Sequence, residues 1–238
     1  MNELVELWLY LSASPLFGLA ATVAVYVLAT GLSARWGQPP WANPVLWSVL
    51  ALAGLLLAGG IPYSAYFAGA QFIHFLLGPA VVALGWLLWQ RREALRRRAP
   101  ALLLAALAGG AAAAGSAVAL ALLLGLPADV VVSLAPKSVT APVAMAIAER
   151  SGGVPALAAV FAVLTGLVGA VTAPYLFTLL RITEPALRGF ALGTTSHGIG
   201  AARALQVHPE AGAFAGLAFA LQAVLAALLL PLALTLFL

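Results

Sequence analysis

Apolar residues fill most of this chain, and proline, glycine and short polar stretches interrupt them at intervals. A membrane-spanning helix needs about 20 apolar residues, and proline favours the first turn of a helix, where its missing N–H group costs nothing. Applied together, these rules predict eight helical elements, at residues 15–34, 44–60, 62–90, 100–126, 128–150, 155–180, 185–206 and 209–238.

Three of the predicted elements contain a break near the middle. Gly78-Pro79 interrupts 62–90, the stretch from Pro136 to Pro142 interrupts 128–150, and the stretch from Gly193 to Gly200 interrupts 185–206. The elements at 100–126, 155–180 and 209–238 are uninterrupted, and their small residues permit close contact between helices. The halves 15–126 and 128–238 show the same order of elements, which suggests an internal duplication but does not establish one.

Composition makes this a membrane protein. Of the 238 residues, 64% are hydrophobic and only 8% are charged, whereas soluble domains carry roughly 25% charged residues. Lipid must therefore replace water as the outer solvent, and an all-α polytopic fold satisfies the backbone there. We expect one transmembrane domain over residues 1–238, with no room for a second, soluble domain.

The net charge of +4 does not indicate nucleic-acid binding. Five of the eleven basic residues lie between Arg91 and Arg98, and such a cluster beside helix ends marks the cytoplasmic side of a membrane. If every element crosses once, both termini lie outside. Arg35, Arg150 and Arg203 then share the cytoplasmic side, with Arg181 and Arg188 opposite. Re-entry of element 128–150 or 185–206 would reverse everything downstream, and the sequence leaves that open.

Lys137 is the only lysine, and it lies between Pro136 and Pro142 inside an apolar run. A cation at membrane depth is expensive and persists mainly where it lines a cavity or meets a partner. The broken helix frees backbone N–H groups that attract anions, and Ser138 and Thr140 add hydroxyls. We favour an anion site over the alternative, a lysine that snorkels to the lipid headgroups.

A second polar cluster joins Thr194, Thr195, Ser196 and His197 between glycines. The glycines allow the backbone to bend and to approach a ligand, and His197 could carry a proton during transport. A membrane-surface loop with an exposed histidine is the competing interpretation.

Weaker candidates lie elsewhere. Gln71 and His74 share a helix face before Gly78-Pro79, and they either line a cavity or form a satisfied polar pair. Asn43 is followed by proline, a pattern typical of a helix N-cap. Arg203, which follows the second cluster, is a further candidate. No buried carboxylate, cysteine, HExxH, GxSxG or P-loop is evident, so we expect no metal, no cofactor and no enzyme.

Several stretches resemble the LrgB/CidB antiholin-like family. They are Leu134-Ala-Pro-Lys-Ser-Val-Thr-Ala-Pro-Val-Ala-Met145, Gly152-Gly-Val-Pro155, Phe75-Leu-Leu-Gly-Pro-Ala80 and the stretch from Arg188 to Ala204, together with Asn43-Pro44. For bacterial members the resemblance implies regulation of murein hydrolases and lysis beside a small holin-like membrane partner. For plastid relatives it implies glycolate/glycerate transport, and bacterial members are also tied to pyruvate.

The residues favour transport, so we predict a secondary carrier of small monocarboxylates. Lys137 and the half-helix after it would hold the carboxylate, and Ser138, Thr140, Thr194, Thr195 and Ser196 would bond its hydroxyl or keto group. His197 would have a proton-linked or gating role. By analogy with other carriers we expect a homodimer in the lipid bilayer. A lysis regulator remains the alternative.

Overall fold

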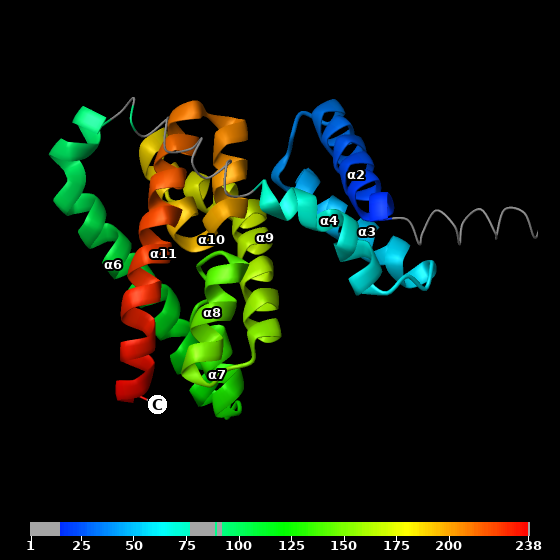
Figure 1. Cartoon of the computed structure of the whole chain (residues 1–238). Coiled ribbons are helices and arrows are strands. Elements are labelled where there is room, and N and C mark those ends of the chain that lie inside the picture. The colour runs from blue at the N-terminus through cyan, green and yellow to red at the C-terminus, as the bar shows by residue number, and fades with distance from the viewer. Residues whose placement is uncertain (1–14, 77–88, 90–91, 238) are drawn as a thin grey trace, which may run out of the picture. The chain divides into compact units, whose positions relative to one another are not determined.

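The computed structural model describes residues 15–76, 89 and 92–237, and within these ranges the chain is helical without strands (Figure 1). The chain forms two compact units, residues 1–82 and 83–238. An all-α membrane fold was predicted, and the described helices confirm it. Four of them, Leu16–Arg35, Arg96–Leu123, Pro155–Leu179 and Pro209–Leu236, are long and apolar enough to cross a membrane.

The first unit contains α2 (Pro15–Arg35), a short 3-10 turn (Pro40–Ala42), α3 (Pro44–Ala58) and α4 (Tyr63–Phe75). Helix α2 packs on both α3 and α4. The Thr22 hydroxyl lies 2.7 Å from the Tyr66 hydroxyl, close to the point where Gly18 lets α2 and α4 approach. A Cβ at Gly18 would lie 1.9 Å from the Tyr66 carbonyl oxygen.

The second unit is built on three long helices, α6 (Arg92–Leu123), α9 (Pro155–Leu179) and α11 (Pro209–Phe237). They correspond to the three uninterrupted apolar spans predicted from the sequence. Between them lie α7 (Ala128–Leu134), α8 (Ala141–Ser151) and α10 (Pro185–Val207). The most extensive contacts join α10 to α11, and α9 contacts both α8 and α10.

Element 128–150 is broken where predicted, and the chain reverses direction there. The N–H of Val154 donates to the Ser133 hydroxyl over 2.7 Å, although 21 residues separate them. In a straight helix these residues would lie about 30 Å apart. Helices α7 and α8 are therefore the two limbs of a hairpin, and Gly152, with φ of +84°, closes α8 before the turn into α9.

The second broken element, α10, also folds back on itself. Its backbone leaves the helical conformation at His197, with φ of 42° and ψ of −135°. A Cβ at Gly200 would lie 2.6 Å from the Leu192 carbonyl oxygen, whereas a straight helix would hold these residues about 12 Å apart. Leu192 accordingly packs with Ala201 and Ala204 of the returning limb.

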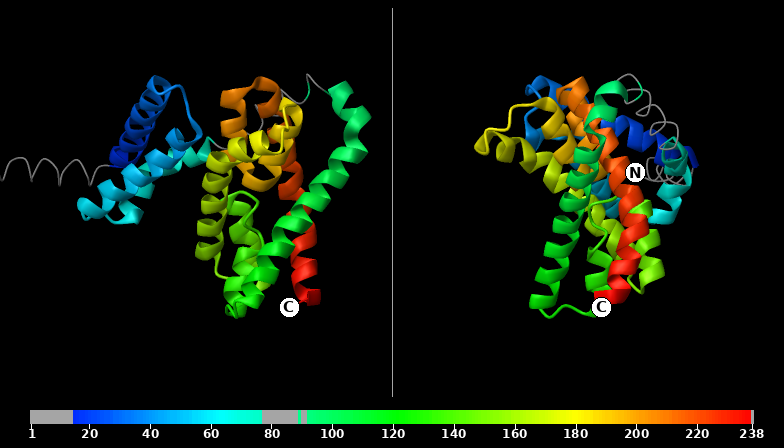
Figure 2. Two further views of the ribbon diagram at one scale, coloured as in Figure 1. Left: turned by 180° about the vertical axis from the view of Figure 1, so that it is seen from behind. Right: turned by 90° about the vertical axis from the view of Figure 1, so that its left-hand side faces the viewer.

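The two hairpins approach α9 from its opposite ends. The α7–α8 hairpin ends where α9 begins, and α10 starts after α9 has ended. The further views agree, with α10 in orange at the end of α9 remote from α7 (Figure 2). Their tips meet α9 near its middle.

The arginine-rich start of α6 lies at the α10 end of this unit. Arg98 pairs with Glu184 over 3.6 Å, and Arg188 and Arg203 line one cavity. The arrangement expected from single crossings, with Arg188 on the side opposite Arg203 and the 91–98 cluster, is therefore wrong. It assumed that elements 128–150 and 185–206 each cross once, whereas both double back.

Helix α6 begins earlier than predicted. Residues 92–98 are the first two turns of the helix rather than a loop, and Pro100 lies inside it. Arginine, glutamate, alanine and leucine are strong helix formers, and Glu93 and Arg97 lie 3.9 Å apart at i,i+4 spacing. Pro100 removes one backbone hydrogen bond without ending the helix.

Candidate functional site

Lys137 lies in the turns that join α7 to α8. Its backbone N–H donates to the Leu134 carbonyl over 3.1 Å, and its side chain is half-buried. Within the described ranges it forms no ion pair. The described part of the chain therefore supplies no countercharge for its ammonium group.

A cavity of about 360 Å³ brings Lys137 together with part of the second polar cluster. The α10 side chains in its wall are Thr195 and Ser196, and α9 contributes Leu164, Thr165, Val168 and Gly169. These α9 residues belong to the middle of a 25-residue helix, so the cavity lies at the depth where the two hairpin tips meet. Two stretches that lie more than 50 residues apart in the sequence thus form one site.

The lining of this cavity suits a small anion. It holds one cation and three hydroxyl groups, and no acidic side chain is among its lining residues. The Thr195 hydroxyl donates to the Ala191 carbonyl over 2.9 Å and lies 3.3 Å from the Ser196 hydroxyl. Ser196 is fully buried, and it lines the same cavity as the lysine.

The other predicted members of the two clusters face elsewhere. Ser138 lines a different cavity, between α6 and α11, and Thr140 takes the N-cap position of α8 without a side-chain hydrogen bond. The Thr194 hydroxyl donates to the Phe190 carbonyl over 2.9 Å, and its methyl group faces Gly109 of α6. Whether any of these contacts substrate stays a prediction.

His197 is buried at the tip of α10 and is not among the residues lining the Lys137 cavity. Its Nε2 lies 2.8 Å from the Ala162 carbonyl oxygen of α9. A Cβ at Gly166 would lie 2.9 Å from the imidazole ring, so the small residue of α9 makes room for it. This placement does not fit the exposed surface loop that was the alternative for this cluster.

Arg203 is buried and lines a third cavity, of about 320 Å³, together with Arg188, Thr183 and His208. The Arg188 guanidinium donates to the Ile182 carbonyl and lies over the Phe177 ring. This cavity is at the arginine-rich end of the unit, away from the hairpin tips.

Candidates in the first unit have local roles. Asn43 is buried, and its side chain accepts hydrogen bonds from the N–H groups of Val45 and Leu46, which confirms it as the N-cap of α3. Gln71 is exposed and donates to the Ala68 carbonyl of its own helix. Gly78, Pro79 and the His74 side chain lie outside the described residues.

Sequence reasoning missed two residues, Thr165 and Gln222. Thr165 lines the Lys137 cavity, and Gln222 is buried in the cavity that holds Ser138. Gln222 is the isolated amide of a long apolar helix, and that isolation is the signal that could have found it. Thr165 is one of three threonines in α9, and its sequence context does not single it out. Over the described part of the chain, no three His, Asp or Glu side chains lie together as a metal site would require.

Comparison with known proteins identifies the family of this chain. The model of the LrgB-like family matches residues 22–236. An uncharacterized protein of Haemophilus influenzae is 32% identical over 210 residues, 88% of this chain and 90% of that protein. YxaC of Bacillus subtilis, also uncharacterized, is 33% identical over 216 residues, 91% of this chain and 94% of its own. A protein of Staphylococcus aureus (strain Mu50) named "Holin-like protein CidB" is 31% identical over 216 residues, with the same coverage. No solved structure matches the chain.

Proposed function

The chain belongs to the LrgB-like family, and we propose that it is a secondary membrane carrier of small monocarboxylates such as glycolate, glycerate or pyruvate. The observation that carries this proposal is the cavity in which Lys137 meets Thr165, Thr195 and Ser196. The ammonium group would bind the carboxylate, and the hydroxyls would hydrogen-bond a hydroxyl or keto oxygen. The volume of about 360 Å³ lies at the small end of the range for ligand pockets, roughly 300–1,000 Å³.

The arrangement around the cavity supports transport. Broken helices that meet near the middle of the membrane are the usual way in which carriers build a substrate site. Here two such hairpins enter from opposite ends of α9, so small movements of either one would open the site to a different side. We propose that the hairpins move against α6, α9 and α11. The proposal also includes proton-coupled transport, a homodimeric assembly, and an internal duplication in which residues 128–238 repeat residues 15–126.

We assign the arginine-rich end of the second unit to the cytoplasmic side of a bacterial inner membrane. Arginines 92, 96, 97, 98, 181, 188 and 203 would lie there, and Arg150 would lie at the other end. That asymmetry follows the positive-inside rule more closely than the arrangement expected from single crossings. The C-terminal end of α11 would then face outward.

Counterflow of labelled glycolate, glycerate and pyruvate in proteoliposomes tests the carrier. We expect saturable exchange by the wild type and a loss of roughly 30-fold or more in Lys137→Ala, since removing one partner of a buried charge pair costs about 2–5 kcal/mol. Undiminished exchange by folded Lys137→Ala protein would exclude this site.

The absence of cysteine allows a sharper version of this test. In Lys137→Cys, 2-aminoethyl methanethiosulfonate reacts at the introduced thiol and restores an amine of similar reach, so exchange should recover. The 2-sulfonatoethyl reagent adds a negative charge at the same place and should not restore it. Equal recovery with both reagents would show that the charge of Lys137 does not act on the substrate.

A second function is favoured by the relatives. Those of Staphylococcus aureus are named "Holin-like protein CidB", and this name supports a regulator of murein hydrolase activity and lysis, acting with a small holin-like membrane partner, more directly than it supports a carrier. Such a regulator would keep its effect on lysis in Lys137→Ala. Autolysis rates of cells that express wild type or Lys137→Ala at equal levels separate the two functions.

A further inference from the structure

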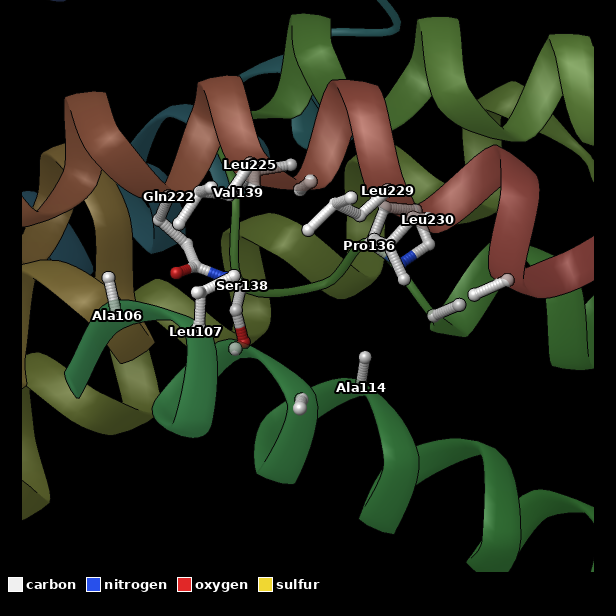
Figure 3. A pocket seen from close by; sticks show the side chains of 15 residues that line it. Ala106, Leu107, Ala114, Pro136, Ser138, Val139, Gln222, Leu225, Leu229 and Leu230 are labelled. Carbon is white, nitrogen blue, oxygen red and sulfur yellow. The ribbon is translucent and has the colours of Figure 1, made fainter. Parts of the chain in front are cut away.

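Ser138 follows Lys137 directly, yet the two side chains line different cavities. The cavity that holds Ser138 has a volume of about 290 Å³ and lies between α6, α11 and the turns that join α7 to α8. Gln222 of α11 also lines it. Figure 3 shows the Gln222 amide reaching from α11 toward the part of the cavity where Ser138 lies.

Both polar side chains are buried, each only 6% exposed, and each carries an oxygen without a hydrogen-bond partner. The atoms are the Ser138 hydroxyl oxygen and Oε1 of Gln222. Leaving a buried polar group unpaired costs about 1–3 kcal/mol. Two such groups in one cavity therefore indicate that something else completes their hydrogen bonds.

The rest of the lining limits what that partner can be. Alanine, leucine, glycine, valine and proline form the other walls, and no charged side chain is among them. Gly110 also makes room for the amide, because a Cβ there would lie 2.1 Å from Nε2 of Gln222. Such a site can recognise a hydroxyl, which donates to a carbonyl oxygen and accepts from a serine hydroxyl. No lining side chain offers a carboxylate a countercharge, so the carboxylate of a hydroxy acid bound here has to lie toward the open side of the cavity.

We propose that Ser138 and Gln222 form a second substrate station that binds the hydroxyl end of a small hydroxy acid. The turns between α7 and α8 then separate two stations, a cationic one at Lys137 and a neutral one at Ser138. This deepens the proposed carrier function and rests on it for the identity of the ligand. Binding of the hydroxyl, and not of the charge, distinguishes the second station from the first.

A thiol reporter inside the cavity tests the station. Ala114 of α6 lines the cavity, and Ala114→Cys leaves both polar side chains intact in a chain without other cysteines. We expect glycolate to slow labelling of the introduced thiol by methyl methanethiosulfonate. Propionate, which has a methyl group in place of the hydroxyl and the same charge, should not slow it.

Variants of the polar pair then show which groups bind. In the Ala114→Cys background, Ser138→Ala or Gln222→Met should raise the glycolate concentration needed for protection roughly five- to tenfold, the loss expected for one hydrogen bond. Ser116→Ala is the matched control, because Ser116 is exposed on the same helix and donates only to the Ala113 carbonyl. Ser138→Ala removes no hydrogen bond, so a structural role for this serine predicts unchanged or slightly higher stability and unchanged protection.

The outcomes separate this proposal from the carrier. Protection by glycolate but not by propionate, lost in Ser138→Ala, supports the second station. It does so even if wild-type proteoliposomes show no counterflow, because that result would exclude only the carrier function. Counterflow that depends on Lys137 without protection at Ala114→Cys would overturn the station and leave the carrier. Equal protection by glycolate and propionate, or no labelling in any condition, would also overturn it, and the cavity would then hold only water or lipid.

Discussion

His197 and Ala162 join the tip of the α10 hairpin to α9, with 2.8 Å between the imidazole Nε2 and the carbonyl oxygen. The same histidine carries the backbone reversal, at φ of 42° and ψ of −135°, a conformation that residues other than glycine adopt at a cost. One residue therefore both turns the chain and anchors the turn. Its placement favours an anchoring role at a hairpin tip over a freely exposed proton carrier.

Two different substitutions of His197 should separate these roles. His197→Ala loses the bond to α9 and keeps the strained backbone, so we expect a loss of about 2–4 kcal/mol in stability. His197→Gly loses the same bond but relieves the strain, and it should be less damaging by about 1 kcal/mol. Thermal unfolding of the purified protein in detergent measures both. A glycine variant less stable than the alanine variant would contradict the strained turn.

Gly169 controls the space beside Ser196 in the Lys137 cavity. A Cβ at Gly169 would lie 1.8 Å from the Ser196 hydroxyl oxygen, so Gly169→Ala must displace that hydroxyl. We expect a raised KM for carboxylate counterflow, by about fivefold if one substrate hydrogen bond is lost. Gly198→Ala is the control, because Gly198 has open space around it. Equal kinetics for the two variants would argue against substrate at Ser196.

Gly193 sets how closely α10 approaches α11. A Cβ there would lie 2.2 Å from the Ala215 carbonyl oxygen, and backbone cannot move aside as a side-chain end can. We expect Gly193→Ala to destabilise the protein by about 1–3 kcal/mol, the usual cost of overpacking. Gly115→Ala lies in α6 with nothing near it and should be neutral or stabilising by up to about 1 kcal/mol. Unfolding midpoints of both variants check this contrast.

Asn43 caps α3 through two hydrogen bonds to backbone N–H groups. Asn43→Ala should cost about 1 kcal/mol, and Asn43→Asp should restore most of that loss because a carboxylate accepts the same bonds and suits a helix N-terminus. Carboxylate counterflow per folded molecule should stay unchanged in both. A drop in counterflow at full stability would instead give Asn43 a part in transport.

The break between α7 and α8 shows which structural features local sequence can predict. Pro136 and Pro142 bracket the predicted interruption, and the helices end at Leu134 and resume at Ala141. In the same way, Asn43 followed by Pro44 correctly predicted where α3 begins. These features follow from backbone chemistry within a few residues. The start of α6 was misplaced because Pro100 is tolerated within a helix that flanking residues favour.

Lys137 shares a cavity with Thr195 and Ser196 and not with its neighbour Ser138. Only the folded chain shows this arrangement. Adjacent residues in a turn can point in opposite directions, and the direction depends on which helices pack around the turn. The same holds for Thr165 and Gln222, because their candidate roles depend on the residues that line the other walls of each cavity.

The sequence alone determined that this is an all-α membrane protein, where its long apolar helices lie, and that elements 128–150 and 185–206 are broken beside polar residues. Those properties depend on hydrophobicity and on proline and glycine acting locally. Only the tertiary structure decided that these two elements fold back, because a break permits both continuation and reversal. Packing selects reversal here: Ser133 binds the backbone at Val154, and Leu192 packs against Ala201 and Ala204. The reversals place Arg188 and Arg203 at one end of the unit and Lys137 at its middle.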